Sequence, residues 1–309
     1  MQLVIGAGEF LGDAVSQALA GEVPIIQMHA DADQETLTDA MKGVDVVHVC
    51  AQAWSPARRL RYRRRPPPFL VRVVEAARQA GVRRLVHLST ADVYGPDHFV
   101  RINEKAELKP VHPYERLKLM EEVWLARAAE DMEVVVLRPA RVIGPGEEWM
   151  IPRLIRRLVD GRIWLAGGGR VTQTFIAASD VGRACLAAAE RGKPGRKYLL
   201  AGFDSTWREF LELAAHSLDV PCRVVSLPYD LAFLRGLGVD MVTPSGAVVW
   251  PGVYAVDAIA KPHLYDDSQT RRDLTWSPSV GSFEQEMPGM EDWLESLARA
   301  SRTAAAQRA

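Results

Sequence analysis

The sequence predicts an α/β fold in which a doubly wound parallel sheet carries a smaller C-terminal lobe. Short apolar runs alternate with amphipathic stretches from the first residue onward, and this β–α alternation is typical of parallel sheets. The run at 44–49 shows no apolar–polar alternation, which indicates a strand covered on both faces. A turn rich in glycine, Gly6–Gly12, separates the first apolar run from the first helical pattern.

The elements of the main sheet follow from this pattern in chain order. Apolar runs predict strands at 3–5, 24–28, 44–50, 85–88 and 134–137. Amphipathic stretches predict helices over 10–20, 34–41, 69–79 and 114–130. Each predicted helix follows a predicted strand, as a doubly wound sheet requires.

The alternation loosens after Gly144-Pro145-Gly146. The pattern then predicts a helix at 151–159, a strand at 163–165, a helix at 180–190 and a strand at 197–201, followed by helices at 207–217 and 283–298. We therefore expect one domain from 1–146 and 175–204, and a substrate lobe from 147–174 and 205–298. The tail at 299–309 is rich in Ala, Arg and Ser and is predicted to be frayed.

Composition excludes several classes of function. The chain has 309 residues, 48% of them hydrophobic, and a net charge of −1, so nothing favours nucleic acid or an anionic membrane. No apolar run approaches the ~20 residues that span a bilayer, and the N-terminus lacks a signal-peptide layout. Three distant cysteines argue against a disulfide framework, and no Cys/His cluster has metal-ligand spacing. We expect a cytoplasmic protein without a metal.

Tyr114 and Lys118 suggest the chemistry. They are four residues apart in a predicted helix, so both side chains lie on one face. A lysine ammonium beside a phenol favours the phenolate and lowers the tyrosine pKa from its ordinary value near 10. Such a tyrosine exchanges a proton with an alcohol or carbonyl oxygen. Thr90, at the end of a predicted strand, would hold that oxygen, and these residues together indicate a hydride-transfer enzyme.

The stretch 58–65 contains six arginines and precedes three prolines. It fits a solvated loop better than a phosphate site, because charge runs are usually solvated.

These motifs resemble the extended short-chain dehydrogenase/reductases, the NAD-dependent epimerase/dehydratase family. The likeness extends from the N-terminus to about Ala298. It rests on the glycine turn at 6–12, the strand at 43–51, the Ser-Thr to Tyr-Gly motif at 89–95 with Tyr114 and Lys118, the acidic Glu122, the loop at 137–146, and the C-terminal segments 265–268 and 274–278. The resemblance implies a Rossmann-like domain that binds NAD or NADP.

The resemblance also assigns residues. It implies that Tyr114 is the catalytic acid/base, that Lys118 lowers its pKa and holds the nicotinamide ribose, and that Thr90 orients the substrate oxygen. The cofactor residues that it implies are Gly6, Gly8, Phe10, Leu11, Gly12, Asp31, Ala51, Tyr114, Lys118, Pro139 and Val142.

The adenosine end departs from the family pattern. Glu9 replaces the middle glycine of the turn, and a carboxylate ~5 Å from a phosphate charge costs roughly 3 kcal/mol at an effective dielectric of 20. Only about twenty residues separate Ile5 from Ile26, and the segment 24–50 resembles the family's third strand onward. This suggests that the second strand and its helix, which in the family read the adenosine ribose, are missing. Ala30 takes the place of the family's adenine-contacting aspartate, and Asp31 beside it is a possible substitute. Pro66 takes the place of a structural asparagine. We expect weaker cofactor binding than in typical relatives.

The substrate positions favour the reductase and 3β-hydroxysteroid-dehydrogenase-like branch, acting on a ketone, aldehyde or secondary alcohol. Nucleotide-sugar members usually carry asparagine and arginine where this chain has Arg141 and Gln173. Arg141 would either bind an anion or form a salt bridge between the lobes. A set of apolar residues would line an apolar pocket or form the lobe's own core: Phe233, Leu234, Trp250 and Tyr254.

Two alternatives to a reductase stay open. The first is a nucleotide-sugar epimerase or dehydratase. The second is a catalytically silent binding or regulatory protein with an eroded cofactor site.

A homodimer is the expected assembly. Leu117, Met120 and Trp124 form a second stripe about 100° from the Tyr114 face of the same helix. In the family this helix commonly packs against its copy; otherwise the stripe packs on the sheet of its own chain. The expected partners are thus a small-molecule substrate and a second copy, with no nucleic acid and no membrane.

Overall fold

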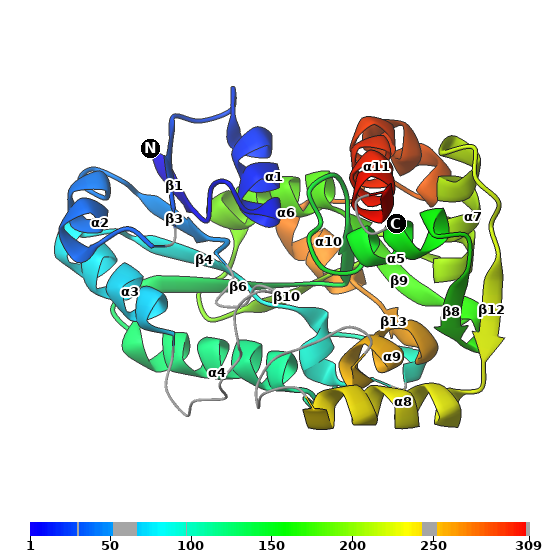
Figure 1. Ribbon diagram of the computed structural model, residues 1–309. Coiled ribbons are helices and arrows are strands. Elements are labelled where there is room, and N and C mark those ends of the chain that lie inside the picture. The colour runs from blue at the N-terminus through cyan, green and yellow to red at the C-terminus, as the bar shows by residue number, and fades with distance from the viewer. Residues whose placement is uncertain (30, 52–66, 97, 243–251, 307–309) are drawn as a thin grey trace.

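A six-stranded parallel sheet forms the frame of the molecule in the computed structural model, which describes residues 1–29, 31–51, 67–96, 98–242 and 252–306 (Figure 1). Its strands are β1 (Gln2–Ile5), β2 (Ile25–Met28), β3 (Val46–Val49), β4 (Arg84–Leu88), β6 (Glu133–Pro139) and β10 (Lys197–Leu200). Their order is β10-β6-β4-β3-β1-β2, and every pair is parallel. The predicted doubly wound sheet is confirmed.

Helices cover both faces of this sheet. The two on one face are α1 (Phe10–Leu19) and α6 (Ala178–Arg191), and those on the other face are α2 (Gln34–Ala40), α3 (Pro68–Ala80) and α4 (Pro113–Ala128). Each face has its own apolar cluster, with Val86 and Leu88 on the α1 side and Leu85 on the α4 side. This alternation along β4 leaves its next α4-facing residue, His87, buried beneath α4.

The strand after α1 corrects one prediction. β2 pairs with β1 in register from Gln2↔Ile25 to Ile5↔Met28, so it takes the second position in the usual strand order. The prediction that the second strand is missing is wrong. Among the described residues, no strand lies beyond β2, so the strand that the sheet lacks is the outer third one. The chain length indicates that one β–α unit is absent, but only the strand pairing shows which unit it is.

A second, five-stranded sheet lies beside the main sheet. It contains β5 (His98–Ile102), β7 (Arg141–Ile143), β9 (Gln173–Ala177), β11 (Phe203–Ser205) and β13 (His263–Tyr265). A further pair joins β8 (Ile163–Ala166) to β12 (Val224–Leu227). Of these strands, only β8 was predicted from the sequence.

The substrate lobe is helical on its outer side. Its helices are α5 (Ile151–Val159), α7 (Trp207–Ser217), α8 (Tyr229–Val242), α9 (Val253–Ala260) and α11 (Phe283–Ala306). The helix α10 (Ser268–Leu274) instead packs against α6 and β10 of the main sheet. An aromatic cluster holds α7 and α11 on the second sheet: the ring of Phe283 lies 4.8 Å from Phe175 and 5.3 Å from Phe210.

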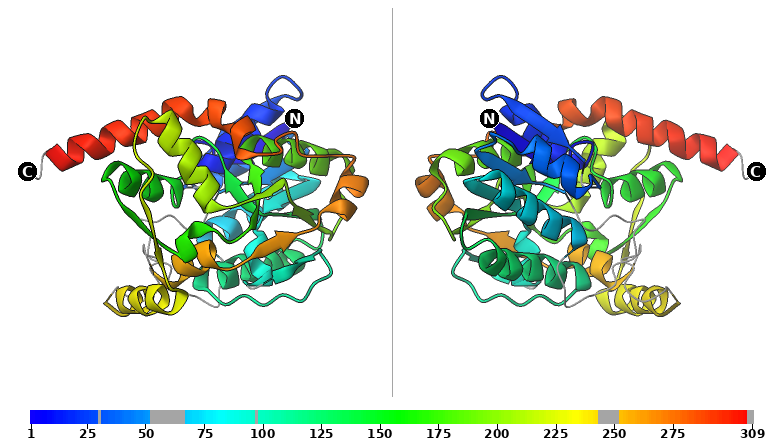
Figure 2. Two further views of the ribbon diagram at one scale, coloured as in Figure 1. Left: turned by 90° about the vertical axis from the view of Figure 1, so that its right-hand side faces the viewer. Right: turned by 90° about the vertical axis from the view of Figure 1, so that its left-hand side faces the viewer.

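The part of the C-terminal tail that the structure describes is helical, whereas a frayed tail was predicted. The helix α11 continues through the residues after Arg299 to Ala306 and projects from the body of the molecule (Figure 2). Alanine has the highest helix propensity, and four of these last residues are alanines at 300 and 304–306. No helix in the described part of the chain is long and apolar enough to cross a membrane.

Candidate active site

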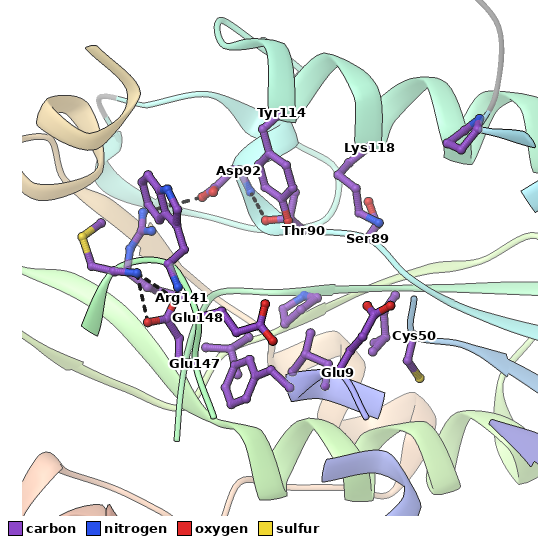
Figure 3. A pocket seen from close by; sticks show the side chains of 18 of the residues that line it. Glu9, Cys50, Ser89, Thr90, Asp92, Tyr114, Lys118, Arg141, Glu147 and Glu148 are labelled. Carbon is purple, nitrogen blue, oxygen red and sulfur yellow. Dashed lines mark hydrogen bonds and ion pairs between the residues drawn. The ribbon is translucent and has the colours of Figure 1, made fainter. Parts of the chain in front are cut away.

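A cavity of about 620 Å³ opens where the carboxyl ends of the main strands meet the substrate lobe. Predicted site residues on its wall are Phe10, Leu11, Asp31, Thr90, Tyr114, Lys118, Pro139 and Val142. Arg141 and Tyr254, each weighed as a possible site residue, are also on the wall. Further residues on the wall, not predicted as site residues, include Glu9, His29, Arg72, Asp92, Glu148 and Trp149. The structure therefore brings the predicted catalytic and cofactor residues to one space (Figure 3).

The helix α4 presents Tyr114 and Lys118 to this cavity, as their spacing predicts. Pro113 occupies its first turn, where a missing N–H is tolerated. The Glu115 carboxylate accepts hydrogen bonds from the backbone N–H of Val111 at 2.5 Å and of His112 at 2.9 Å. These contacts fix the start of the helix one residue from Tyr114.

Two neighbouring hydroxyls after β4 have different surroundings. Thr90 forms a hydrogen bond with Tyr114, and its Oγ1 also accepts the Asp92 N–H at 3.2 Å. Ser89 instead donates to Glu122 at 2.5 Å, beneath α4. Thr90 is thus placed to touch a substrate oxygen beside Tyr114, and Ser89 stabilises the packing of the loop.

The pKa of Tyr114 differs from the prediction. Burial raises it above its ordinary value, and the negative charges of Asp92 and Glu121 raise it further, while the hydrogen bond with Thr90 lowers it. The net direction is thus opposite to the one expected, but Lys118 is not among the main causes of this shift, and its effect on the pKa of Tyr114 stays a prediction. The Lys118 ammonium lies 2.8 Å from Glu121, and that carboxylate balances its charge.

The glycine turn is built for close packing. Gly6 and Gly8 have φ of 102° and 83°, a region that favours glycine. A Cβ on Gly12 would lie 1.9 Å from the Gly6 carbonyl oxygen, and a Cβ on Gly6 would lie 2.6 Å from the Ala51 nitrogen. These four predicted cofactor residues therefore shape the turn behind the cavity wall. The Gly8 N–H donates to Asp13 at 2.7 Å.

The nucleotide end fits a dinucleotide except at one side chain. The turn lets the first residues of α1, Phe10 and Leu11, line the cavity, and a helix N-terminus favours phosphate. Glu9 lies on the wall opposite Tyr114 (Figure 3), so a carboxylate stands where the resemblance requires a glycine.

The carboxyl end of β2 supplies the adenosine end of the cavity. His29 and Asp31 follow this strand and line the wall with Arg72 of α3. Asp31 comes 19 residues after Gly12, near the ~20-residue spacing at which Rossmann folds place the ribose-binding acid. The second strand and the helix after it, which were predicted to be missing, are therefore both present. Ala30 lies outside the described residues.

Arg141 belongs to a contact between the lobes. Its guanidinium lies 3.8 Å from Asp92, and its Nε donates to the Gln173 side chain at 3.3 Å. The Gln173 amide in turn donates to the backbone carbonyls of Ala258 and Lys261, at 2.8 and 2.9 Å. Of the two alternatives for Arg141, a salt bridge is the one present. Its partner Asp92 lies in the same predicted domain, and the contact with Gln173 is the one that reaches the substrate lobe.

Aromatic side chains form the substrate end of the cavity. The ring of Tyr254 lies 4.9 Å from Trp149 and 5.9 Å from Tyr114. Tyr254 also belongs to the apolar cluster of the substrate lobe, so it both lines the cavity and forms part of the lobe's core. Leu234 is 63% exposed and Phe233 pairs with Tyr229 at 5.8 Å, away from this wall.

Three features named from the sequence lie outside the described residues: Trp250, Pro66 and the arginine run at 58–65. Within the described ranges, no group of three His, Cys, Asp or Glu side chains has an arrangement that could hold a metal ion.

The second stripe of α4 packs mainly inside its own chain. Leu117 is 7% exposed and belongs to the substrate-lobe cluster, against which Met120 also packs. Trp124 packs beneath the main sheet. Packing of the stripe within its own chain was the alternative to a dimer contact. The dimer itself stays a prediction.

Known proteins resemble the chain in sequence and in fold. The family model of the "NAD dependent epimerase/dehydratase family" matches residues 3–201. A 4-hydroxy-2-methyl-3-oxo-4-farnesyl-3,4-dihydroquinoline-1-oxide ketoreductase of Stigmatella aurantiaca is 29% identical over 205 residues, which cover 64% of this chain and 61% of that protein. A 2-alkyl-3-oxoalkanoate reductase of Stenotrophomonas maltophilia is 26% identical, covering 90% and 94%.

The fold matches a UDP-glucuronic acid 4-epimerase of Bacillus cereus, solved with UDP-glucuronic acid and NAD. The TM-score is 0.75 at 19% identity, and the match covers 96% of this chain and 100% of the other. Because the family model spans more than half of the chain, the protein belongs to the NAD dependent epimerase/dehydratase family.

Proposed function

We propose that the protein is a nicotinamide-dependent oxidoreductase that acts on a ketone, aldehyde or secondary alcohol without a nucleotide. The observation that carries this proposal is the meeting of Thr90, Tyr114 and Lys118 on one wall of the cavity. A bound nicotinamide would donate or accept hydride at the substrate carbon. Tyr114 would transfer the proton at the substrate oxygen, and Thr90 would hold that oxygen.

The cofactor site supports a dinucleotide. The Gly6–Gly12 turn would bind the diphosphate at the start of α1, Lys118 and Tyr114 would hold the nicotinamide ribose, and Asp31 would bind the adenosine ribose. Pro139 and Val142 line the wall near the same end of β6 and would pack on the nicotinamide. Glu9 would weaken diphosphate binding by charge repulsion.

The substrate end favours a compound without a diphosphate. Arg141 is paired with Asp92, and the side-chain amide of Gln173 donates its hydrogen bonds to backbone carbonyls. The side chains around them are the aromatic rings of Trp149 and Tyr254 and the exposed carboxylate of Glu148. An apolar or aromatic carbonyl compound suits this lining, whereas a diphosphate would meet negative charge.

Two other functions compete with this one. A nucleotide-sugar epimerase or dehydratase is favoured by the fold of the solved relatives, one of which was crystallised with UDP-glucuronic acid. A silent binding protein is favoured by Glu9 in the glycine turn.

A binding screen separates the three functions. Calorimetry with NAD, NADH, NADP and NADPH is expected to detect at least one dinucleotide; no heat from any of them at millimolar concentration would favour the silent protein. Thermal shifts with apolar ketones, measured beside UDP- and dTDP-sugars, then rank the substrates. Stabilisation by a nucleotide sugar alone would reverse the proposal.

A further inference from the structure

A second buried carboxylate accompanies the catalytic lysine. Glu121 is 0% exposed, and its Oε2 lies 2.8 Å from the Nζ of Lys118, which is itself only 3% exposed. The Nε2 of His87 lies 3.4 Å from the same oxygen. The acidic residue that the family resemblance assigns is the next one, Glu122, so Glu121 has no assigned role.

The neighbouring glutamate has a different partner. Glu122 accepts the Arg138 guanidinium through both oxygens, at 2.9 and 2.5 Å, and Ser89 at 2.5 Å. Arg138 therefore balances the charge of Glu122. Burial lowers the pKa of His87, so its ring is neutral near pH 7 and leaves Lys118 as the cation that balances Glu121.

We propose that Glu121 is a positioning residue that holds the Lys118 ammonium and balances its charge, so that Tyr114 keeps its proton and serves the site as an acid. This inference rests on the proposed function and gives it a direction, carbonyl reduction.

The charges that face Tyr114 come in two pairs. Lys118 and Glu121 lie on its own helix, while Asp92 comes from the loop after β4 and Arg141 from β7. Each cation is paired with one of the carboxylates, and the other side chains against the phenol, Thr90 and Tyr254, are neutral. Among the described residues around the phenol, no cation is left unbalanced to favour the phenolate.

A protonated phenol suits one direction of the reaction. In reduction, the carbonyl carbon receives hydride from a reduced nicotinamide and the carbonyl oxygen takes the phenolic proton of Tyr114. The products are the alcohol, the oxidised nicotinamide and a phenolate that regains its proton from solvent. Alcohol oxidation would need the phenolate at the start, and buried balanced charges make it scarce near neutral pH.

The test reads the proton on Tyr114 directly. Protein labelled with [13Cζ]tyrosine is titrated by NMR, and Tyr114→Phe identifies the resonance. The wild-type midpoint is expected above the ordinary tyrosine value near 10. Glu121→Gln leaves Lys118 unbalanced, and an unpaired cation within ~4–6 Å lowers such a midpoint by about 1 to 3 pH units. An unchanged midpoint in Glu121→Gln would overturn the proposal.

A second pair of variants serves if the single variant does not fold. Lys118→Met leaves Glu121 unpaired and is expected to raise the midpoint, whereas the double variant Lys118→Met/Glu121→Gln buries no unpaired charge and is expected to bring it back toward wild type. Equal midpoints in these two variants would mean that the charge of Glu121 does not reach Tyr114. The titration needs neither substrate nor turnover, so its failure is separate from a failure of the oxidoreductase function.

Discussion

The hydroxyl of Tyr254 donates a hydrogen bond of 2.9 Å to Asp92. Tyr254 belongs to α9 of the substrate lobe, and Asp92 follows β4 of the main sheet two residues after Thr90. Because Asp92 is one of the charges that raise the pKa of Tyr114, this bond fixes a charge that acts on the Tyr114 phenol. The two parts of the molecule therefore meet through a polar contact at the wall of the cavity.

Removing this contact should cost stability and substrate binding together. We expect Tyr254→Phe to lower the free energy of unfolding by about 1.5–3 kcal/mol, the range for hydrogen bonds to charged groups, measured in urea at pH 7. Tyr229→Phe is the matched control, because Tyr229 donates to Asp257 at 2.8 Å and is not among the described residues that line the cavity. Only Tyr254→Phe should also weaken the thermal shift that a bound ketone produces. If both variants weakened this shift equally, the loss of ketone binding would not come from the contact between Tyr254 and Asp92.

Tyr114→Phe should remove turnover and preserve the fold. Loss of a general acid costs about 10²- to 10⁴-fold in kcat, and a phenyl ring keeps the contact with Tyr254. The measurement is the rate of nicotinamide absorbance change with a ketone found in the screen, next to circular dichroism and cofactor calorimetry. A variant that keeps most of its kcat would remove Tyr114 from the mechanism.

The cofactor preference should depend on Asp31. A carboxylate at the end of β2 binds the ribose 2′-hydroxyl and repels a 2′-phosphate, so NAD(H) is expected to bind more tightly than NADP(H). Asp31→Asn keeps the size and removes the charge, and it should narrow the ratio of the two Kd values by about tenfold, or roughly 1.4 kcal/mol. Calorimetric Kd values for both cofactors provide the test. Tighter NADP(H) binding by the wild type would instead assign the dominant role to Arg72, on the same wall.

The main sheet and the catalytic helix could be predicted because their signals are local. The buried strands read as continuous apolar runs, and Tyr114 and Lys118 share a helix face by spacing alone. The position of β2 could not be predicted in this way, since one strand between α1 and β3 fits either the second or the third place. Only its pairing with β1 decides.

The electrostatics of the site depend on long-range contacts. Asp92 and Tyr254 are separated by 162 positions in the chain. The pairing of Lys118 with Glu121 could not be predicted for another reason. The i,i+3 spacing is visible in the sequence, but whether that glutamate turns inward depends on the packing of α4 on β4.

The dimer prediction now rests on fewer residues of α4. Val123 is 46% exposed, and Met120 and Trp124 are partly exposed beside it. If α4 meets its copy there, light scattering at micromolar concentration should give twice the chain mass of 34.2 kDa. Val123→Asp would bury two carboxylates in a two-fold contact and should yield the monomer, whereas Val111→Asp, exposed and just before α4, is the control. A monomeric wild type would refute the prediction.

The stability of the α4 start should depend on pH through Glu115. Burial raises the pKa of this carboxyl to about 7, against an ordinary value of 4.5, and the nearby charge of Asp92 adds to the shift. A raised folded-state pKa contributes stability that is fully present below about pH 4.5 and is lost as pH rises to about 7. Glu115→Gln mimics the protonated form and should lack this loss.

The difference in unfolding free energy between Glu115→Gln and wild type should therefore grow in favour of the variant between pH 4.5 and 8. At 1.36 kcal/mol per pH unit, the growth is on the order of 3 kcal/mol. Urea titrations of both proteins at several pH values measure it, and Glu75→Gln, exposed on α3, is the control with no expected change. A difference that does not depend on pH would mean that the hydrogen bonds from Val111 and His112 hold Glu115 charged throughout.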